Sequence, residues 1–191
     1  MPHMPETECN ALIQELKRAQ TYLEFGMGGS TTLAARIGVP NIISVDSSKE
    51  WVDNILLQIS QLELKGSVQL LHANLGETGD WGYPKNSDGI ANWPSYYAGP
   101  WIVVRQKKID PDLVLIDGRF RVACFLFSLL NLKAGSTILW DDYLLRPEYH
   151  RVEEYLAPEE MHGGMALFRV PDVKDTGTIV TGLFTNLYDL G

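Results

Sequence analysis

The stretch Thr21–Gly38, TYLEFGMGGSTTLAARIG, indicates the fold class of this chain. It runs from an apolar piece, TYLEF, through a cluster of glycines into a piece with helical spacing. A strand that enters a helix through a glycine-rich turn is typical of the first β-α unit of α/β folds that bind nucleotides. The stretch therefore predicts such a unit and raises the question of which ligand the turn binds.

Similar apolar runs recur along the chain and alternate with helical patterns. The strand-like runs are NIISV, VQLLH, DLVLI and STILW, each apolar on both faces as a buried parallel strand is. Helices are predicted over 11–19, over 48–62 with Ser47 or Ser48 as N-cap, and over FRVACFLFSLLNLKAG. This order predicts an α/β fold with a doubly wound parallel sheet.

The C-terminal part predicts a different arrangement. After a predicted helix in RPEYHRVEEYLA come MALFRV and TIVTGLFTN, separated by the polar loop PDVKDTG. We expect these two runs to form a closing antiparallel pair of strands.

Residues 76–100, GETGDWGYPKNSDGIANWPSYYAGP, fit neither pattern. They hold five Gly, three Pro and five Trp or Tyr, which is too many helix and strand breakers for a core element. A loop of this length in a compact domain is typically functional or mobile. We expect either a packed Ω-type loop or a lid over a ligand.

The composition of the chain limits the number of domains and the class of partner that it can have. Its 191 residues, 45% hydrophobic and 21% charged, predict one domain over 1–191 with an N-terminal helix within 1–20. A net charge of −8 argues against duplex nucleic acid as a partner. Of the two cysteines, Cys124 lies in an apolar run and is interpreted as a buried small hydrophobe.

The sequence shows no pattern that would direct the chain to a membrane or to secretion. The start MPHMPETECN shows no secretory signal pattern, and no apolar run reaches the roughly 20 residues of a membrane helix. We expect a cytoplasmic protein without a membrane partner. Its oligomeric state stays open, with a homodimer as one option.

The residue that discriminates between ligands of the glycine turn is Glu24. The turn has no GxxxxGK[ST] and no Lys, which excludes a phosphate loop, and GxGxxG fits at Gly26 and Gly28 but has Thr31 at its third position. Glu24 stands two positions before Gly26, where a carboxylate would repel a pyrophosphate. It suits a cationic ligand, and S-adenosylmethionine carries a sulfonium and an ammonium group.

Two further strand ends support a nucleoside. Asp46 ends the second strand, where a carboxylate can accept hydrogen bonds from both ribose hydroxyls, although it can also cap the next helix. Asn74 follows the third strand and can contact an adenine edge or serve as a turn residue.

With these positions in register, the chain resembles the class I S-adenosylmethionine-dependent methyltransferases. The resemblance covers about residues 20–145 and rests on LEFGMGGST, ISVDSS, HANLG and LVLIDG. It implies a seven-stranded sheet of order 3-2-1-4-5-7-6 with the last strand antiparallel. It also implies that Glu24, Gly26 and Gly28 bind the methionine part of the cofactor, Asp46 the ribose and Asn74 the adenine. Further predicted cofactor-binding residues are Gly29, Ser30, Ser47 and Asp117. The family has Asp where Asn74 stands. More narrowly, TGDWGYP, DLVLIDGRFRVAC and LWDDY resemble bacterial methyltransferase-like proteins of unassigned substrate.

Three carboxylates mark the acceptor side. Asp117 ends one strand and Asp141 and Asp142 end the next, so all three are predicted to meet at one sheet edge. This is similar to metal-dependent catechol-type O-methyltransferases, in which the carboxylates hold a divalent ion such as Mg²⁺ or Ca²⁺. The chain departs from that group, with Asp142 in place of Asn and Gly118-Arg119 where a Lys is common.

Arginines offer an alternative interpretation of the same edge. Arg119 and Arg121 follow Asp117, and Arg146 follows Asp142, so ion pairs can replace the metal. One or two arginines can then clamp an anionic acceptor, and a single Asp acting as general base is a third alternative.

The sequence thus predicts a methyltransferase that uses S-adenosylmethionine and acts on a small-molecule acceptor, on a hydroxyl oxygen, with or without a divalent metal. Asp117, Asp141, Asp142 and Arg119 are the candidate catalytic residues. The rival predictions are a methyltransferase-fold binding or regulatory protein without turnover, and an NAD-dependent oxidoreductase.

Overall fold

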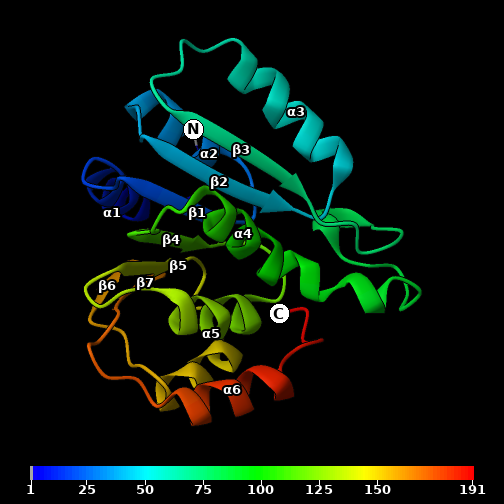
Figure 1. Cartoon of the computed structure of the whole chain (residues 1–191), viewed down its shortest axis with the longest axis vertical. Helices are drawn as coiled ribbons and strands as arrows, with labels where there is room; N and C mark the ends of the chain where they lie inside the picture. Colours follow the sequence, from blue (N-terminus) through cyan, green and yellow to red (C-terminus); the bar gives the residue numbers. More distant parts are fainter. Residues whose placement is uncertain (1) are drawn as a thin grey trace.

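The computed structural model describes residues 2–191. Its strands are β1 (Thr21–Phe25), β2 (Asn41–Asp46), β3 (Ser67–His72), β4 (Leu113–Ile116), β5 (Thr137–Trp140), β6 (Glu160–His162) and β7 (Met165–Arg169). Within the described residues these seven strands form one sheet of order β3-β2-β1-β4-β5-β7-β6 (Figure 1). Strands β1 to β5 run parallel, whereas β7 is antiparallel to both β5 and β6. The predicted fold class and strand order are confirmed.

Helices cover both faces of the sheet. The α-helices are α1 (Glu6–Leu16), α2 (Gly29–Ile37), α3 (Lys49–Ser60), α4 (Pro94–Lys107), α5 (Arg121–Asn131) and α6 (Thr176–Thr185), with 3-10 helices η1 (Asp80–Gly82), η2 (Ile90–Asn92) and η3 (Pro147–Glu154). Helices α1, α2 and α3 pack on one face, and α4, α5 and α6 on the face turned to the viewer in Figure 1. None of the helices within 2–191 is long and apolar enough to cross a bilayer.

Strand alternation divides the core between the two faces. In β1, Leu23 and Phe25 point to the α4–α5 side, whereas Tyr22 packs with α1 and α2. The even-numbered residue Glu24 therefore also faces the α2 side, because successive side chains of a strand alternate. Strands β1, β4 and β5 are buried along their whole length, as the apolar runs predict.

The C-terminal strand prediction was wrong in one element. The run TIVTGLFTN forms most of α6, and the antiparallel pair is instead β6 and β7. Its β-branched residues favour a strand, but Ile179 and Leu183 are buried at helical spacing. Asp175 caps the helix by accepting a hydrogen bond from the Thr178 amide at 3.1 Å.

The prediction of a loop over 76–100 is corrected at its C-terminal end. Helix α4 begins at Pro94, and Pro100 lies inside it. Pro94 lies in the first turn of the helix, where a proline costs no hydrogen bond because a backbone N–H has no helical partner at that position. The preceding part of the segment lies beyond the arrowhead of β3 (Figure 1).

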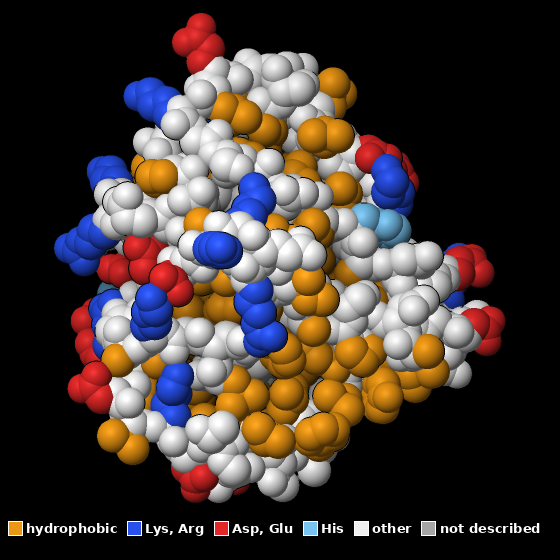
Figure 2. All heavy atoms as spheres, viewed as in Figure 1, with side chains coloured by type: hydrophobic (Ala, Val, Ile, Leu, Met, Phe, Trp, Pro, Cys, Tyr) orange, Lys and Arg blue, Asp and Glu red, His pale blue; other side chains and the backbone are white. Residues whose placement is uncertain are grey.

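The face that carries α4, α5 and α6 is apolar over part of its surface. Figure 2 shows hydrophobic side chains gathered over this region. Ile102 of α4 and Phe184 of α6 are 55% and 69% exposed. This surface is on a helical face of the sheet, whereas the cavity described next lies at the strand ends.

Candidate functional site

A cavity of about 610 Å³ opens at the carboxyl ends of β1, β2, β4 and β5. This is the edge at which doubly wound sheets bind ligands. Its walls come from six parts of the chain: residues 2–4, 26–30, 46–48 with Trp51, Gly79 and 81–83 with Tyr96, 117–119 with Arg121, and 141–142 with Arg146. The glycine turn, Asp46 and the three predicted acceptor-side carboxylates thus lie around one cavity.

The glycine turn passes directly beneath the end of β4. Gly26 has φ +99°, and a Cβ there would lie 2.6 Å from the Asp117 carbonyl carbon and from the Gly118 nitrogen. Only glycine combines this conformation with so close an approach. The turn leads into the N-terminus of α2 at Gly28 and Gly29, which lines the cavity and offers backbone N–H groups to an anion.

Glu24 lies in a cage of hydroxyl groups. Its side chain is fully buried and accepts hydrogen bonds from Tyr22 at 3.0 Å and Ser44 at 2.7 Å, and from the hydroxyls of Ser30 and Thr31. Burial raises its pKa, and the four hydroxyl donors oppose that shift. Glu24 is not among the residues that line the cavity, but Ser30 is. The Glu24 carboxylate therefore does not itself line the cavity, and it is linked to the cavity wall by the hydrogen bond that the Ser30 hydroxyl donates to it.

Asp46 and Ser47 line the cavity at the end of β2, as expected for a nucleoside site. The Asp46 carboxylate accepts a hydrogen bond from the Ser48 amide at 2.8 Å. Burial raises its pKa, while hydrogen bonds from backbone amides lower it. The Ser47 hydroxyl donates to the Gly82 carbonyl at 2.9 Å and so ties η1 to the cavity rim.

Asn74 lies away from the cavity. Its side chain is exposed and accepts a hydrogen bond from the Gly76 amide at 3.1 Å, which makes it a turn residue. Of the two roles considered for this position, the structure favours the turn.

The acceptor-side carboxylates are joined by arginines. Buried Arg121 donates to the Asp117 carboxylate at 3.2 Å and to the Asp141 backbone carbonyl at 2.6 Å. Asp142 accepts from Arg146 at 3.2 Å and lies 3.8 Å from Arg121. Arg121 and Arg146 thus form part of the predicted ion-pair network, whereas Arg119 and the Asp141 carboxylate form no ion pair within residues 2–191.

Two of these carboxyl groups have strongly perturbed pKa values. Burial, followed by the charge of Asp141, raises the pKa of Asp117 to about 8 against the opposing charge of Arg121. Burial, followed by the charge of Asp142, raises the pKa of Asp141 to about 6. Asp141 Oδ1 is buried and has no hydrogen-bond partner among residues 2–191. Groups perturbed in this way cluster at functional sites.

The carboxylates do not fit a divalent metal. Guanidinium groups occupy one side of both Asp117 and Asp142, where an ion would need bare oxygen ligands. In the described part of the chain, no three His, Cys, Asp or Glu side chains are grouped to hold an ion. The geometry favours the ion-pair alternative.

Aromatic side chains that were not singled out from the sequence complete the site. Trp81 and Tyr83 line the cavity from the 76–93 segment, and Trp51 lines it from α3. The Arg119 guanidinium lies over the Tyr83 ring at 4.0 Å. For Trp81 and Tyr83, the available signal in the sequence was the density of Trp and Tyr in a Gly- and Pro-rich segment. Trp51 donates a hydrogen bond to the Met27 carbonyl in the glycine turn, a contact between distant residues that the sequence pattern does not indicate.

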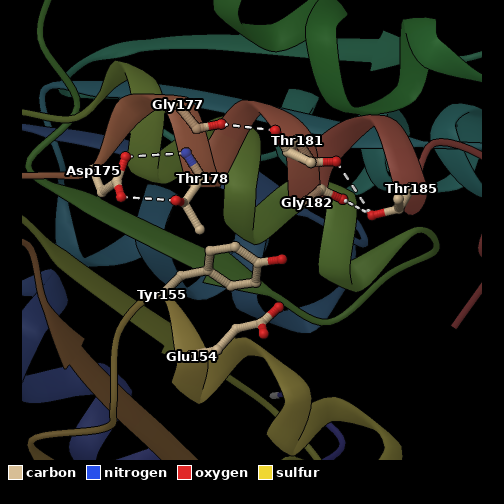
Figure 3. A pocket seen from close by; sticks show the side chains of 8 residues that line it. All are labelled: Glu154, Tyr155, Asp175, Gly177, Thr178, Thr181, Gly182 and Thr185. Carbon is tan, nitrogen blue, oxygen red and sulfur yellow. Dashed lines mark hydrogen bonds between the residues drawn. The ribbon is translucent and has the colours of Figure 1, made fainter.

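A second hollow lies between η3 and α6 (Figure 3). Most of its polar groups already form hydrogen bonds within α6 and its N-cap. Asp175 accepts a hydrogen bond from Thr178, and Thr181 donates one to the Gly177 carbonyl. It contains none of the residues predicted for ligand binding. The cavity at the strand ends is therefore the candidate site.

The fold matches that of known methyltransferases. A methyltransferase-like protein from Silicibacter pomeroyi is 31% identical over 99% of this chain and 97% of its own, with a TM-score of 0.87. The chain belongs to the class I S-adenosylmethionine-dependent methyltransferase superfamily. No protein-family model and no curated protein matches the sequence.

Other solved methyltransferases share the fold at low identity. A methyltransferase from Geobacter sulfurreducens is 14% identical over 89% of this chain and 82% of its own, with a TM-score of 0.57. An O-methyltransferase from Bacillus cereus, solved in complex with SAH (S-adenosylhomocysteine), is 14% identical over 88% of this chain and 82% of its own, with a TM-score of 0.53.

Proposed function

We propose that this chain transfers the methyl group of S-adenosylmethionine to a hydroxyl oxygen of a small-molecule acceptor. One observation carries the proposal: a single cavity joins the glycine turn and Asp46 on one side to Asp117 and Asp141 on the other. A donor on the first side and an acceptor on the second would then meet inside one space.

The donor side suits an adenosyl amino acid. Asp46 would accept hydrogen bonds from the ribose hydroxyls, and the amides at the start of α2 would bind the methionine carboxylate. Ser30, whose hydroxyl donates a hydrogen bond to Glu24, would help to position the amino-acid part of the cofactor. When bound, S-adenosylmethionine supplies a methyl group activated by its sulfonium.

On the acceptor side, Asp141 is the residue proposed to contact the reacting hydroxyl. Asp141 lines the cavity, and its carboxyl group would accept a hydrogen bond from the acceptor there. A carboxyl pKa of about 6 also suits a group that takes up the hydroxyl proton near neutral pH. Asp117 and Asp142 remain paired with arginines, so no metal is included in the proposal. Alignment supplies most of the rate in such a transfer.

Calorimetric titration with S-adenosylhomocysteine tests the donor side. We expect a Kd tighter than about 1 mM and at least a tenfold loss in Asp46→Asn, because a hydrogen bond to a charged group contributes about 1.5–3 kcal/mol. Asp53→Asn, an exposed carboxylate of α3 outside the cavity, is the matched control. The absence of binding in the wild type would refute the proposal.

Turnover is tested separately by S-adenosylhomocysteine release with a panel of hydroxylated small molecules. We expect release that depends on the acceptor and persists with a chelator. Binding without any release across the panel would instead support the binding-protein alternative.

A further inference from the structure

Arg119 differs from the other arginines of the cavity because it has no anionic partner among residues 2–191. Its side chain lines the cavity although the residue is only 8% exposed. Across residues 2–191 its guanidinium forms no hydrogen bond and no ion pair, whereas Arg121 and Arg146 both pair with carboxylates. A nearly buried cation thus faces the cavity with its donors free.

The residue is nevertheless held in place. Its backbone N–H donates to the Tyr96 hydroxyl at 3.2 Å, and its guanidinium carbon lies 4.0 Å from the centre of the Tyr83 ring. A Cβ at Gly118 would lie 1.9 Å from the Tyr96 hydroxyl and 2.8 Å from the Gly26 nitrogen, so the backbone here packs tightly on the glycine turn. Stacking on an aromatic face orients the planar group and leaves its edge free to bind.

The surrounding charges do not satisfy this cation. Burial raises the pKa of Asp46, and the charge of Arg119 is among the effects that oppose this rise, yet the two groups form no ion pair. The Asp46 carboxylate takes its hydrogen bonds from backbone amides, including that of Ser48 at 2.8 Å. The guanidinium is little exposed and its N–H donors face the cavity, so an anion bound there would offset its reduced hydration.

We propose that Arg119, supported by Tyr83, binds a carboxylate or phosphate group of the methyl acceptor, which makes the acceptor a small anionic hydroxy compound. This inference rests on the proposed function. Planar guanidinium matches both anions with two parallel hydrogen bonds. The methionine carboxylate of the cofactor is the other possible source of the anion, but the N-terminus of α2 already offers it backbone donors.

The test uses the full chain and three variants. Arg119→Gln removes the charge at similar length, and Arg119→Lys keeps the charge but loses the planar fork. Arg105→Gln is the matched control, because Arg105 is exposed on α4 and donates to Asn131 outside the cavity. The anion probes are inorganic phosphate and acetate, titrated with and without saturating S-adenosylhomocysteine.

We expect at least one anion to bind the wild type and Arg105→Gln alike, and to bind Arg119→Gln at least tenfold more weakly. Arg119→Lys should be weakened at least threefold, and this variant decides the matter if Arg119→Gln does not fold. The affinity for S-adenosylhomocysteine should stay within twofold in the Arg119 variants. Equal anion binding in all variants, or none in the wild type, would overturn the proposal.

The source of the anion is resolved by a second cofactor probe. If Arg119→Gln loses tenfold in S-adenosylhomocysteine affinity but binds 5′-methylthioadenosine, which lacks the amino-acid part, as the wild type does, the anion is the cofactor carboxylate and the acceptor assignment fails. If S-adenosylhomocysteine does not bind the wild type at all, the proposed function fails. Phosphate or acetate binding to the ligand-free protein still tests the Arg119 site in that case.

Discussion

Replacing Asp141 with Asn should stabilise the ligand-free protein at alkaline pH and have little effect at acidic pH. Asp141 is 7% exposed, and its Oδ1 is buried without a hydrogen-bond partner in the described residues. Burial and the charges of Asp142 and Glu8 raise its pKa to about 6, against the favourable charge of Arg121. The folded protein therefore holds this carboxyl group at a cost when it is ionised.

The sign follows from the direction of the shift. The pKa is higher in the folded state than the ordinary value of 3.8, so between these values the folded protein binds more protons than the unfolded chain. The free energy of unfolding therefore falls as the pH rises from about 4 to about 6, and the full cost is present above that range. A shift of about two pKa units corresponds to roughly 3 kcal/mol. We expect about 2 kcal/mol after allowing for an Asn amide that lacks an ideal partner.

Urea denaturation at pH 4.5 and pH 8 measures this difference. Asp141→Asn should exceed the wild type by about 2 kcal/mol at pH 8 and by less than about 1 kcal/mol at pH 4.5. Asp88→Asn removes an exposed carboxylate that forms no ion pair within residues 2–191, and it should show no such pH dependence. A gain that is equal at both pH values, or a loss at pH 8, would refute the reasoning.

Three further substitutions test the parts of the site. Gly26→Ala should lower the free energy of unfolding by more than about 3 kcal/mol and abolish S-adenosylhomocysteine binding, because the new Cβ would lie 2.6 Å from backbone atoms. Gly135→Ala is the control: this glycine has φ +81° and open space around it, so the loss in urea denaturation should be only about 1–2 kcal/mol and binding should stay intact. Glu24→Gln should lose about 1–3 kcal/mol of stability, because four hydroxyl donors then share fewer acceptor sites, and an unchanged urea midpoint would contradict the cage. Trp81→Ala should leave the Tm within about 2 °C, as its side chain is 85% exposed, but weaken S-adenosylhomocysteine binding about threefold or more in calorimetry if this residue covers the ligand.

Much of the fold was predictable because it depends on short-range patterns. The apolar runs of β1, β2, β4 and β5 and the glycine turn are local signals, and their order selects the doubly wound sheet. The misassigned segment, α6, shows the limit of such signals. Its β-branched residues favour a strand locally, but packing of Ile179 and Leu183 on one side favours a helix.

The site was predictable by location more than by role. The ends of β2, β4 and β5 place Asp46, Asp117 and Asp141 at one cavity, as the alternation of strands and helices requires. The sequence alone could not show that the Glu24 side chain is enclosed by hydroxyl groups instead of lining the cavity, because one of these hydroxyls belongs to Ser44 in the neighbouring strand β2.

The sequence by itself determined the sheet, the glycine turn and the edge at which polar residues gather. These features depend on propensity and periodicity within a few residues, which act before any distant contact forms. The tertiary structure decided that Arg121 is neutralised and Arg119 is not, although the two are alike and two positions apart. That difference depends on which groups from distant parts of the chain approach each guanidinium: the Asp141 carbonyl for one and the Tyr83 ring for the other. Pairing of buried charges is a property of three-dimensional neighbours, and only the folded chain supplies them.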